Sequence, residues 1–169
     1  MMSGTGASGW EDLTAYRLDP DATADLLARQ TECTFIWTNR AGYPRGVIVN
    51  YIARRGRIWT TATTKRPRIA AVRAEPRTGI AISSKGSGVT SRQSLSLQGL
   101  STVHDAPAVV DWFLPEFSAA MRPGEPKRAA EFARLLDSEH RVVIEFVPTA
   151  TTAYDGAKMW SAAPGARPS

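Results

Sequence analysis

The sequence is poor in the residues that build disulfide or metal frameworks. It contains one cysteine, Cys33, and two histidines, His104 and His140. A single thiol cannot form an intrachain disulfide, and one cysteine cannot by itself supply a cysteine-based metal site. We therefore expect Cys33 to be a buried structural thiol, and we expect no bound metal.

Long apolar runs and convincing catalytic constellations are also missing. No stretch reaches the ~18 consecutive apolar residues of a membrane span, and the N-terminal segment lacks the pattern of a secretory signal. Neither a nucleophilic triad nor a pair of carboxylates stands out. His104 and His140 are expected to be surface or capping residues. We expect a cytoplasmic protein with no membrane partner and no catalytic side chain of its own.

What is present fits one globular domain with an affinity for anions. The chain has 169 residues, of which 43% are hydrophobic, and its 21 Lys and Arg against 16 Asp and Glu give a net charge of +5. A charge of this sign favours phosphates, carboxylates or nucleic acid. Nucleic acid is not expected, because the basic residues are not interleaved with aromatics on one strand. Small polar residues predict disordered tails at 1–12 and 158–169 around a domain at 13–157.

Helix and strand signals alternate along the chain. Proline at a first turn predicts helices from Pro20, Pro67 and Pro107, and Pro115 is expected to bend or break the third. Asp19 is expected to cap the first helix. A fourth helix is expected in KRAAEFARLLD. Alternating β-branched and aromatic residues predict six strands: TFIWT, VIVNYI, RIWTT, TGIAIS, RQSLSLQGLSTVH and RVVIEFVP. Together these elements predict an α+β barrel.

The junction after RIWTT carries the strongest functional signal. Threonines at 60, 61, 63 and 64 precede Lys65 and Arg66, and a helix begins at Pro67. The first amides of a helix lack intrahelical acceptors and carry the positive end of the helix dipole, so this junction could cradle a phosphate. A solvated basic helix start is the alternative interpretation of the same residues.

Three pieces of sequence, taken together, resemble a known family. Trp59, Thr60, Thr64, Lys65 and Arg66 form the first piece, RGVIVN from Arg45 the second, and RQSLSLQG with Gln93 and Gly99 the third. Their order and their places on strands resemble the flavin-binding split-barrel superfamily typified by pyridoxamine 5'-phosphate oxidase, over roughly residues 25 to 150.

The resemblance implies a homodimeric, six-stranded antiparallel split β-barrel with flanking helices and two cofactor sites at the dimer interface. It implies that Lys65 and Arg66 hold the cofactor phosphate, that the strand from Arg45 lies along the flavin ring, and that Gln93 hydrogen-bonds the cofactor. The cofactor-binding residues it implies are Arg45, Val47, Val49, Asn50, Trp59, Thr60, Thr64, Lys65, Arg66 and Gln93. Asn50 stands where the family has lysine, and the helix VVDWFLPEFSA lacks the tyrosine, arginine and serine of the true oxidase. A relative with another small-molecule substrate is therefore expected.

The expected function is that of an oxidoreductase that transfers hydride with FMN or the deazaflavin coenzyme F-420. The preference of the chain for arginine over lysine favours the deazaflavin. Its acidic glutamyl tail could meet four arginines: Arg54, Arg55, Arg57 and Arg68. The alternative interpretation of these arginines is that they only make a hairpin turn and a helix face soluble. Aromatic side chains could cover the ring or could be ordinary core residues: Trp37, Tyr51, Trp59, Trp112 and Phe113. The alternative function is a non-catalytic flavin- or haem-binding storage or sensor protein of the same fold.

Overall fold

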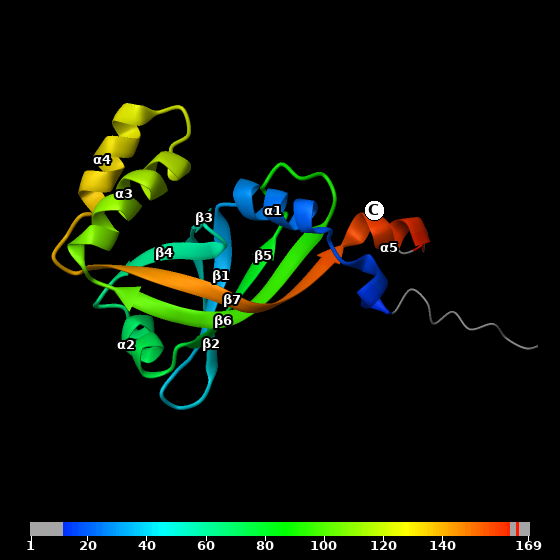
Figure 1. The fold of residues 1–169 in the computed structure, drawn as a ribbon, viewed down its shortest axis with the longest axis horizontal. Coiled ribbons are helices and arrows are strands. Elements are labelled where there is room, and N and C mark those ends of the chain that lie inside the picture. The colour runs from blue at the N-terminus through cyan, green and yellow to red at the C-terminus, as the bar shows by residue number, and fades with distance from the viewer. Residues whose placement is uncertain (1–11, 163–164, 166–169) are drawn as a thin grey trace, which may run out of the picture.

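The computed structural model describes residues 12–162 and 165. An antiparallel sheet in the order β2-β1-β5-β6-β7-β4-β3 curls on itself, and helices lie at its ends and outer face (Figure 1). The strands are β1 (Glu32–Thr38), β2 (Pro44–Asn50), β3 (Ile52–Arg54), β4 (Arg57–Thr63), β5 (Arg77–Ser83), β6 (Gln93–His104) and β7 (Arg141–Asp155). The helices are η1 (Leu13–Tyr16), α1 (Pro20–Arg29), α2 (Pro67–Ala74), α3 (Pro107–Met121), α4 (Pro126–Leu136) and α5 (Gly156–Ala162).

The sheet has seven strands rather than the six expected, because VIVNYI divides at Tyr51. Before Tyr51, β2 pairs with β1, and after it β3 pairs with β4. Tyr51 itself is only 1% exposed, and its hydroxyl donates a hydrogen bond to Leu27 O at 3.2 Å. The chain thus passes from one edge of the sheet to the other at Tyr51, whose side chain stays in the core.

The main core fills the inside of the curled sheet. Alternate side chains of five strands meet there, as the period of two requires: Phe35, Ile58, Ile80, Leu97 and Ile144. Cys33 lies in the same core at 3% exposure, and burial raises the pKa of its thiol to about 12. A thiol that stays protonated in an apolar setting is chemically inert, which agrees with the structural role expected for it.

A second core joins α3 and α4 to the outer face of the sheet. Phe113 and Phe117 on α3 are buried with Val143 on β7. Pro115 was expected to bend or break this helix, and it does not break it, since α3 runs from Pro107 to Met121 with Pro115 inside it. The proline faces solvent, while buried residues before and after it hold both halves of the helix in place.

The two ends of the described chain meet beside η1. The side chain of Asp19 does not cap α1 as expected; it accepts a hydrogen bond from Lys158 Nζ at 2.8 Å instead. Lys158 belongs to α5, so the segment expected to be a tail from 158 is helical up to Ala162. Residues 1–11 of the other expected tail lie outside the described residues. No helix in the described part is both long enough and apolar enough to cross a membrane.

The last strand continues far beyond the expected RVVIEFVP. Strand β7 reaches Asp155 and pairs with β6 along its length, with a shift of register between Gln98 and Gly99. A Cβ atom built on Gly99 would lie 2.2 Å from Val147 O and 2.8 Å from Phe146 Cζ. Only glycine allows the two strands to approach this closely at the bulge.

Candidate functional site

The predicted phosphate cradle is a strand-to-helix junction in the structure. Strand β4 ends at Thr63 and α2 begins at Pro67. The Thr64 amide donates to His140 O at 2.9 Å, and the Arg66 amide donates to Thr63 O at 3.0 Å. These bonds fix the turn and leave the side chains of Lys65 and Arg66 exposed at the start of the helix.

Arg68 adds a third cation to this junction. Its Nε atom is buried and has no hydrogen-bond partner among the described residues. Burial and then the nearby charge of Arg66 lower the pKa of the Arg68 guanidinium. An unpartnered guanidinium beside two exposed cations is a donor set that fits a phosphate group, because arginine binds phosphate oxygens through paired N–H donors.

The residues predicted on β2 divide between the two faces of the sheet. Val47 and Val49 pack against the main core, whereas Asn50 is exposed and donates from Nδ2 to Thr31 O at 3.3 Å. Arg45 is exposed near the start of the strand. Successive side chains of a strand point to opposite faces. The side chains of Arg45, Val47, Val49 and Asn50 therefore cannot all contact the same ligand, whereas the backbone of the strand can lie along it.

Trp59 and Thr60 also point to opposite faces of β4. Thr60 is 3% exposed, and its hydroxyl donates to Asn50 O at 2.7 Å inside the barrel. Trp59 lies on the outer face beneath α3, with its ring centroid 4.9 Å from that of Trp112. Within the described chain, Thr60 therefore joins β4 to the end of β2, while Trp59 joins the sheet to the helices.

Within one chain, Gln93 lies far from the turn between β4 and α2 that carries Thr64, Lys65 and Arg66, the predicted phosphate junction. It stands opposite Asp155 at the end of β7, whereas Thr63 stands opposite Arg141 at the beginning of that strand. The side-chain amide of Gln93 donates to Ser91 Oγ at 3.0 Å. A single copy of the chain thus brings Thr64, Lys65 and Arg66 together but keeps Gln93 apart from them.

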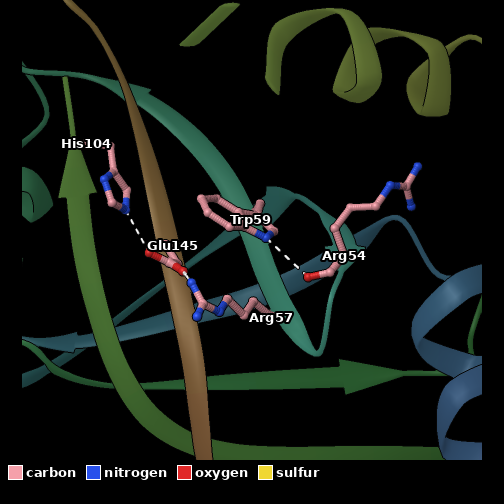
Figure 2. Close-up of polar contacts among 5 residues, drawn as sticks. All are labelled: Arg54, Arg57, Trp59, His104 and Glu145. Atoms are coloured by element: carbon pink, nitrogen blue, oxygen red, sulfur yellow. Dashed lines mark hydrogen bonds and ion pairs between the residues drawn. The ribbon is translucent and has the colours of Figure 1, made fainter. Parts of the chain in front are cut away.

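A buried acid that the sequence analysis missed organises the outer face of the sheet. Glu145, whose side chain is 9% exposed, lies 2.8 Å from His104 Nε2 and is also bonded to the guanidinium of Arg57 (Figure 2). His104, whose side chain is 26% exposed, is therefore the partner of a buried carboxylate, a role that the expected surface or capping position did not include. The signal was available, since a glutamate inside VVIEFV has to be paired when the strand is buried.

Replacing Glu145 by glutamine will lower the free energy of unfolding by about 2 kcal/mol, because two hydrogen bonds to a charged acceptor become bonds to a neutral amide. Urea unfolding measures the change. Glu116→Gln is the matched control, since the Glu116–Arg54 ion pair is about half exposed at 48% and 49% and such pairs contribute under about 1 kcal/mol. Equal midpoints for the two variants would contradict the structural role assigned to Glu145.

The arginines of the β3–β4 hairpin lie away from the phosphate junction. Arg57 begins β4 and Lys65 follows its end, so the intervening strand separates them by roughly 20 Å. Arg54, Arg55 and Arg57 instead line a cavity with two tryptophans. Arg68 is the one residue of the expected glutamyl-tail group that lies at the phosphate junction.

A larger, apolar cavity opens on another face of the sheet. Its volume is about 990 Å³, and strands β1, β2, β5, β6 and β7 contribute to its lining through Thr34, Ile48, Ala81, Ser94 and Tyr154 among others. Ile48 at its edge is 69% exposed. Neither this cavity nor the arginine-lined one includes Lys65 or Arg66. In one chain the side chains of Lys65 and Arg66 are exposed to solvent.

The architecture is that of an α+β protein with a curled antiparallel sheet. No family model and no curated protein matches the sequence. Solved structures do match. The conserved hypothetical protein Rv2991 from Mycobacterium tuberculosis is 16% identical with a TM-score of 0.75, over 86% of this chain and 90% of that one.

Two further structures extend the comparison. A protein assigned as a pyridoxamine 5'-phosphate oxidase from Listeria innocua is 17% identical with a TM-score of 0.60, over 79% of this chain and 95% of that one. An F420 reductase is 18% identical with a TM-score of 0.55, over 75% of this chain and 93% of that one. The chain shares its fold with these three proteins, in agreement with the split-barrel fold that its sequence motifs predicted.

Proposed function

We propose that this protein is an oxidoreductase that holds FMN or the deazaflavin coenzyme F-420 by its phosphate at the start of α2. The observation that carries the proposal is the orphaned Arg68 Nε beside the exposed side chains of Lys65 and Arg66. A bound phosphate gives that guanidinium an acceptor and offsets part of the positive charge of the three neighbouring side chains. The fold shared with an F420 reductase supports a flavin-type ring rather than another phosphorylated ligand.

In this proposal the protein positions the cofactor, and the cofactor when bound supplies hydride transfer. Lys65, Arg66 and Arg68 hold the phosphate, and the β2 backbone from Arg45 to Asn50 offers an extended edge for the ring. The proposal requires no nucleophilic side chain. This is consistent with the 3% exposure of Cys33 and the raised pKa of its thiol.

We also propose that two copies of the chain pair across the apolar cavity. Ile48 is 69% exposed at its edge and Leu13 is 52% exposed within it. Large apolar side chains gathered over a hollow face are typical of an interface between chains.

Replacing Ile48 by aspartate will raise the dimer dissociation constant at least about tenfold, because a two-fold interface receives the buried charge twice. Sedimentation equilibrium measures the constant. Leu135→Asp is the control, since Leu135 is 77% exposed on α4 and does not line the cavity. A wild-type chain that stays monomeric, or equal dissociation of the two variants, would contradict pairing across this face.

Titration of the purified chain with FMN and with F-420 tests the proposed function. We expect saturable binding of one of the two. Once the bound cofactor has been reduced chemically with added dithionite or borohydride, we expect an added small-molecule acceptor to reoxidise it. Binding without electron transfer to any acceptor would instead indicate the non-catalytic carrier. Failure to bind either cofactor would remove the assignment of the phosphate junction.

A further inference from the structure

A second cavity lies between the β3–β4 hairpin and α3. Its volume is about 530 Å³, and it is lined by Arg54, Arg55, Arg57, Trp59, Trp112 and Glu116. This volume is within the range of small-molecule sites, which are about 300–1,000 Å³. The lining combines flat aromatic walls with several guanidinium groups, which is an unusual composition for a packing defect.

The charges around the cavity leave one cation unmatched. Arg54 Nε is bonded to Glu116 Oε2 at 2.7 Å. Arg57 is bonded to Glu145 (Figure 2), which is not among the residues that line the cavity. Across the residues that the structure describes, Arg55 makes no hydrogen bond or ion pair through its side chain. Arg54 and Arg57 are each paired with a carboxylate, so Arg55 is the one guanidinium of the lining without a carboxylate partner, which matches a ligand with one negative charge.

The aromatic walls are held in a fixed arrangement. The rings of Trp59 and Trp112 meet edge to face at an interplanar angle of 87°. The indole N–H of Trp59 also points to Arg54 O, 3.4 Å away, as Figure 2 shows. Rigid indole faces beside guanidinium planes favour a flat aromatic ligand, which can stack on either kind of surface.

The backbone of Arg55 has a conformation that is unfavourable for arginine. Arg55 and Gly56 form the two-residue loop of the hairpin with φ angles of 55° and 72°. Asn or Gly suits such a loop best, and a residue of another type is strained there. An arginine kept in this conformation at the cavity is consistent with a contribution from its charged side chain that offsets the strain.

We propose that this cavity is a second binding site, and that it takes a planar aromatic ring carrying a single carboxylate. Arg55 supplies the unmatched cation for the carboxylate, and the two indoles supply the surfaces for the ring. The site lies at the opposite end of β4 from Lys65 and Arg66. It goes beyond the cofactor site and does not depend on it.

Calorimetric titration of the full chain with 2-naphthoate tests the proposal. We expect saturable binding, and at least about fivefold weaker binding both of neutral 2-naphthamide and of non-aromatic cyclohexanecarboxylate. 2-Naphthyl phosphate, with a second negative charge, is expected to bind no more tightly than 2-naphthoate. No saturable binding, or equal affinity for 2-naphthoate and either the amide or the cyclohexane probe, would overturn the proposal.

Two substitutions locate the site. Arg55→Asn keeps a residue suited to the loop, so the fold is retained, and it should weaken 2-naphthoate at least about fivefold. Trp112→Leu should weaken it similarly. Arg40→Asn, at an exposed arginine in the β1–β2 loop, and the Lys65→Ala plus Arg66→Ala double variant should leave the affinity unchanged. Wild-type affinity in the folded Arg55→Asn protein would overturn the assignment.

Discussion

Replacing Lys65 and Arg66 together by alanine will weaken the binding of FMN or F-420 at least about 30-fold. Two charge-assisted contacts to the phosphate are lost, and together they contribute at least about 2 kcal/mol. Both side chains are exposed, so the fold should be unaffected. Fluorescence or calorimetric titration of the wild-type and variant chains with each cofactor measures the change.

The chain supplies a matched control for this double variant. Lys127 and Arg128 also stand at the start of a helix beside a proline, directly after Pro126 in α4. Their replacement by alanine removes the same two charges from a different part of the surface. Equal losses of affinity in the two double variants would mean that net charge alone accounts for the effect. Unaltered affinity in both would contradict the assignment of the phosphate to Lys65 and Arg66.

Replacing Gly99 by alanine will destabilise the protein by about 3 kcal/mol or prevent folding, because the added methyl group meets backbone. The nearest atom is Val147 O at 2.2 Å, and Phe146 Cζ and Cε2 lie at 2.8 and 2.9 Å. Neither the carbonyl nor the buried ring can retreat without opening the pairing of β6 with β7. For a chain of this size the loss lowers the melting temperature by about 6–12 °C, which calorimetry measures.

Gly79 is the control for that substitution. It lies on neighbouring strand β5, where a Cβ atom would meet Leu97 O at 3.4 Å and Ile36 Cβ at 3.7 Å, which is ordinary contact. Gly79→Ala should change the free energy of unfolding by less than about 1 kcal/mol. If Gly99→Ala is as well tolerated as Gly79→Ala, the close approach of β6 and β7 is not what requires glycine at 99.

The sequence predicted local structure well where the chemistry is local. Proline at a first turn located the starts of α1, α2 and α3, and alternation located most strands. Predictions that depended on neighbours in space were less successful. Pro115 does not break α3 because buried residues on both sides hold the helix against the sheet. Asp19 does not cap α1, since Lys158 from the other end of the chain binds it.

Some residues of the candidate site could be placed from the sequence, and others could not. Thr64, Lys65 and Arg66 are consecutive, so their position at the start of α2 followed from the sequence alone. Glu145, His104 and Arg57 come from three strands, and no spacing along the chain announces their meeting. A glutamate in an apolar strand shows that a partner is needed, but strand pairing decides which partner it has.

The order of residues by itself determined an α+β chain of alternating strands and proline-started helices, and it placed a basic junction after the strand RIWTT. Tertiary structure alone decided that Tyr51 divides a strand in two, that Gly99 lies against the Val147 carbonyl, and that Trp59 faces α3 while Thr60 faces the barrel. The reason is physical. Dihedral preferences and capping act over a few residues, whereas burial and charge pairing depend on which distant segments the folded sheet brings together.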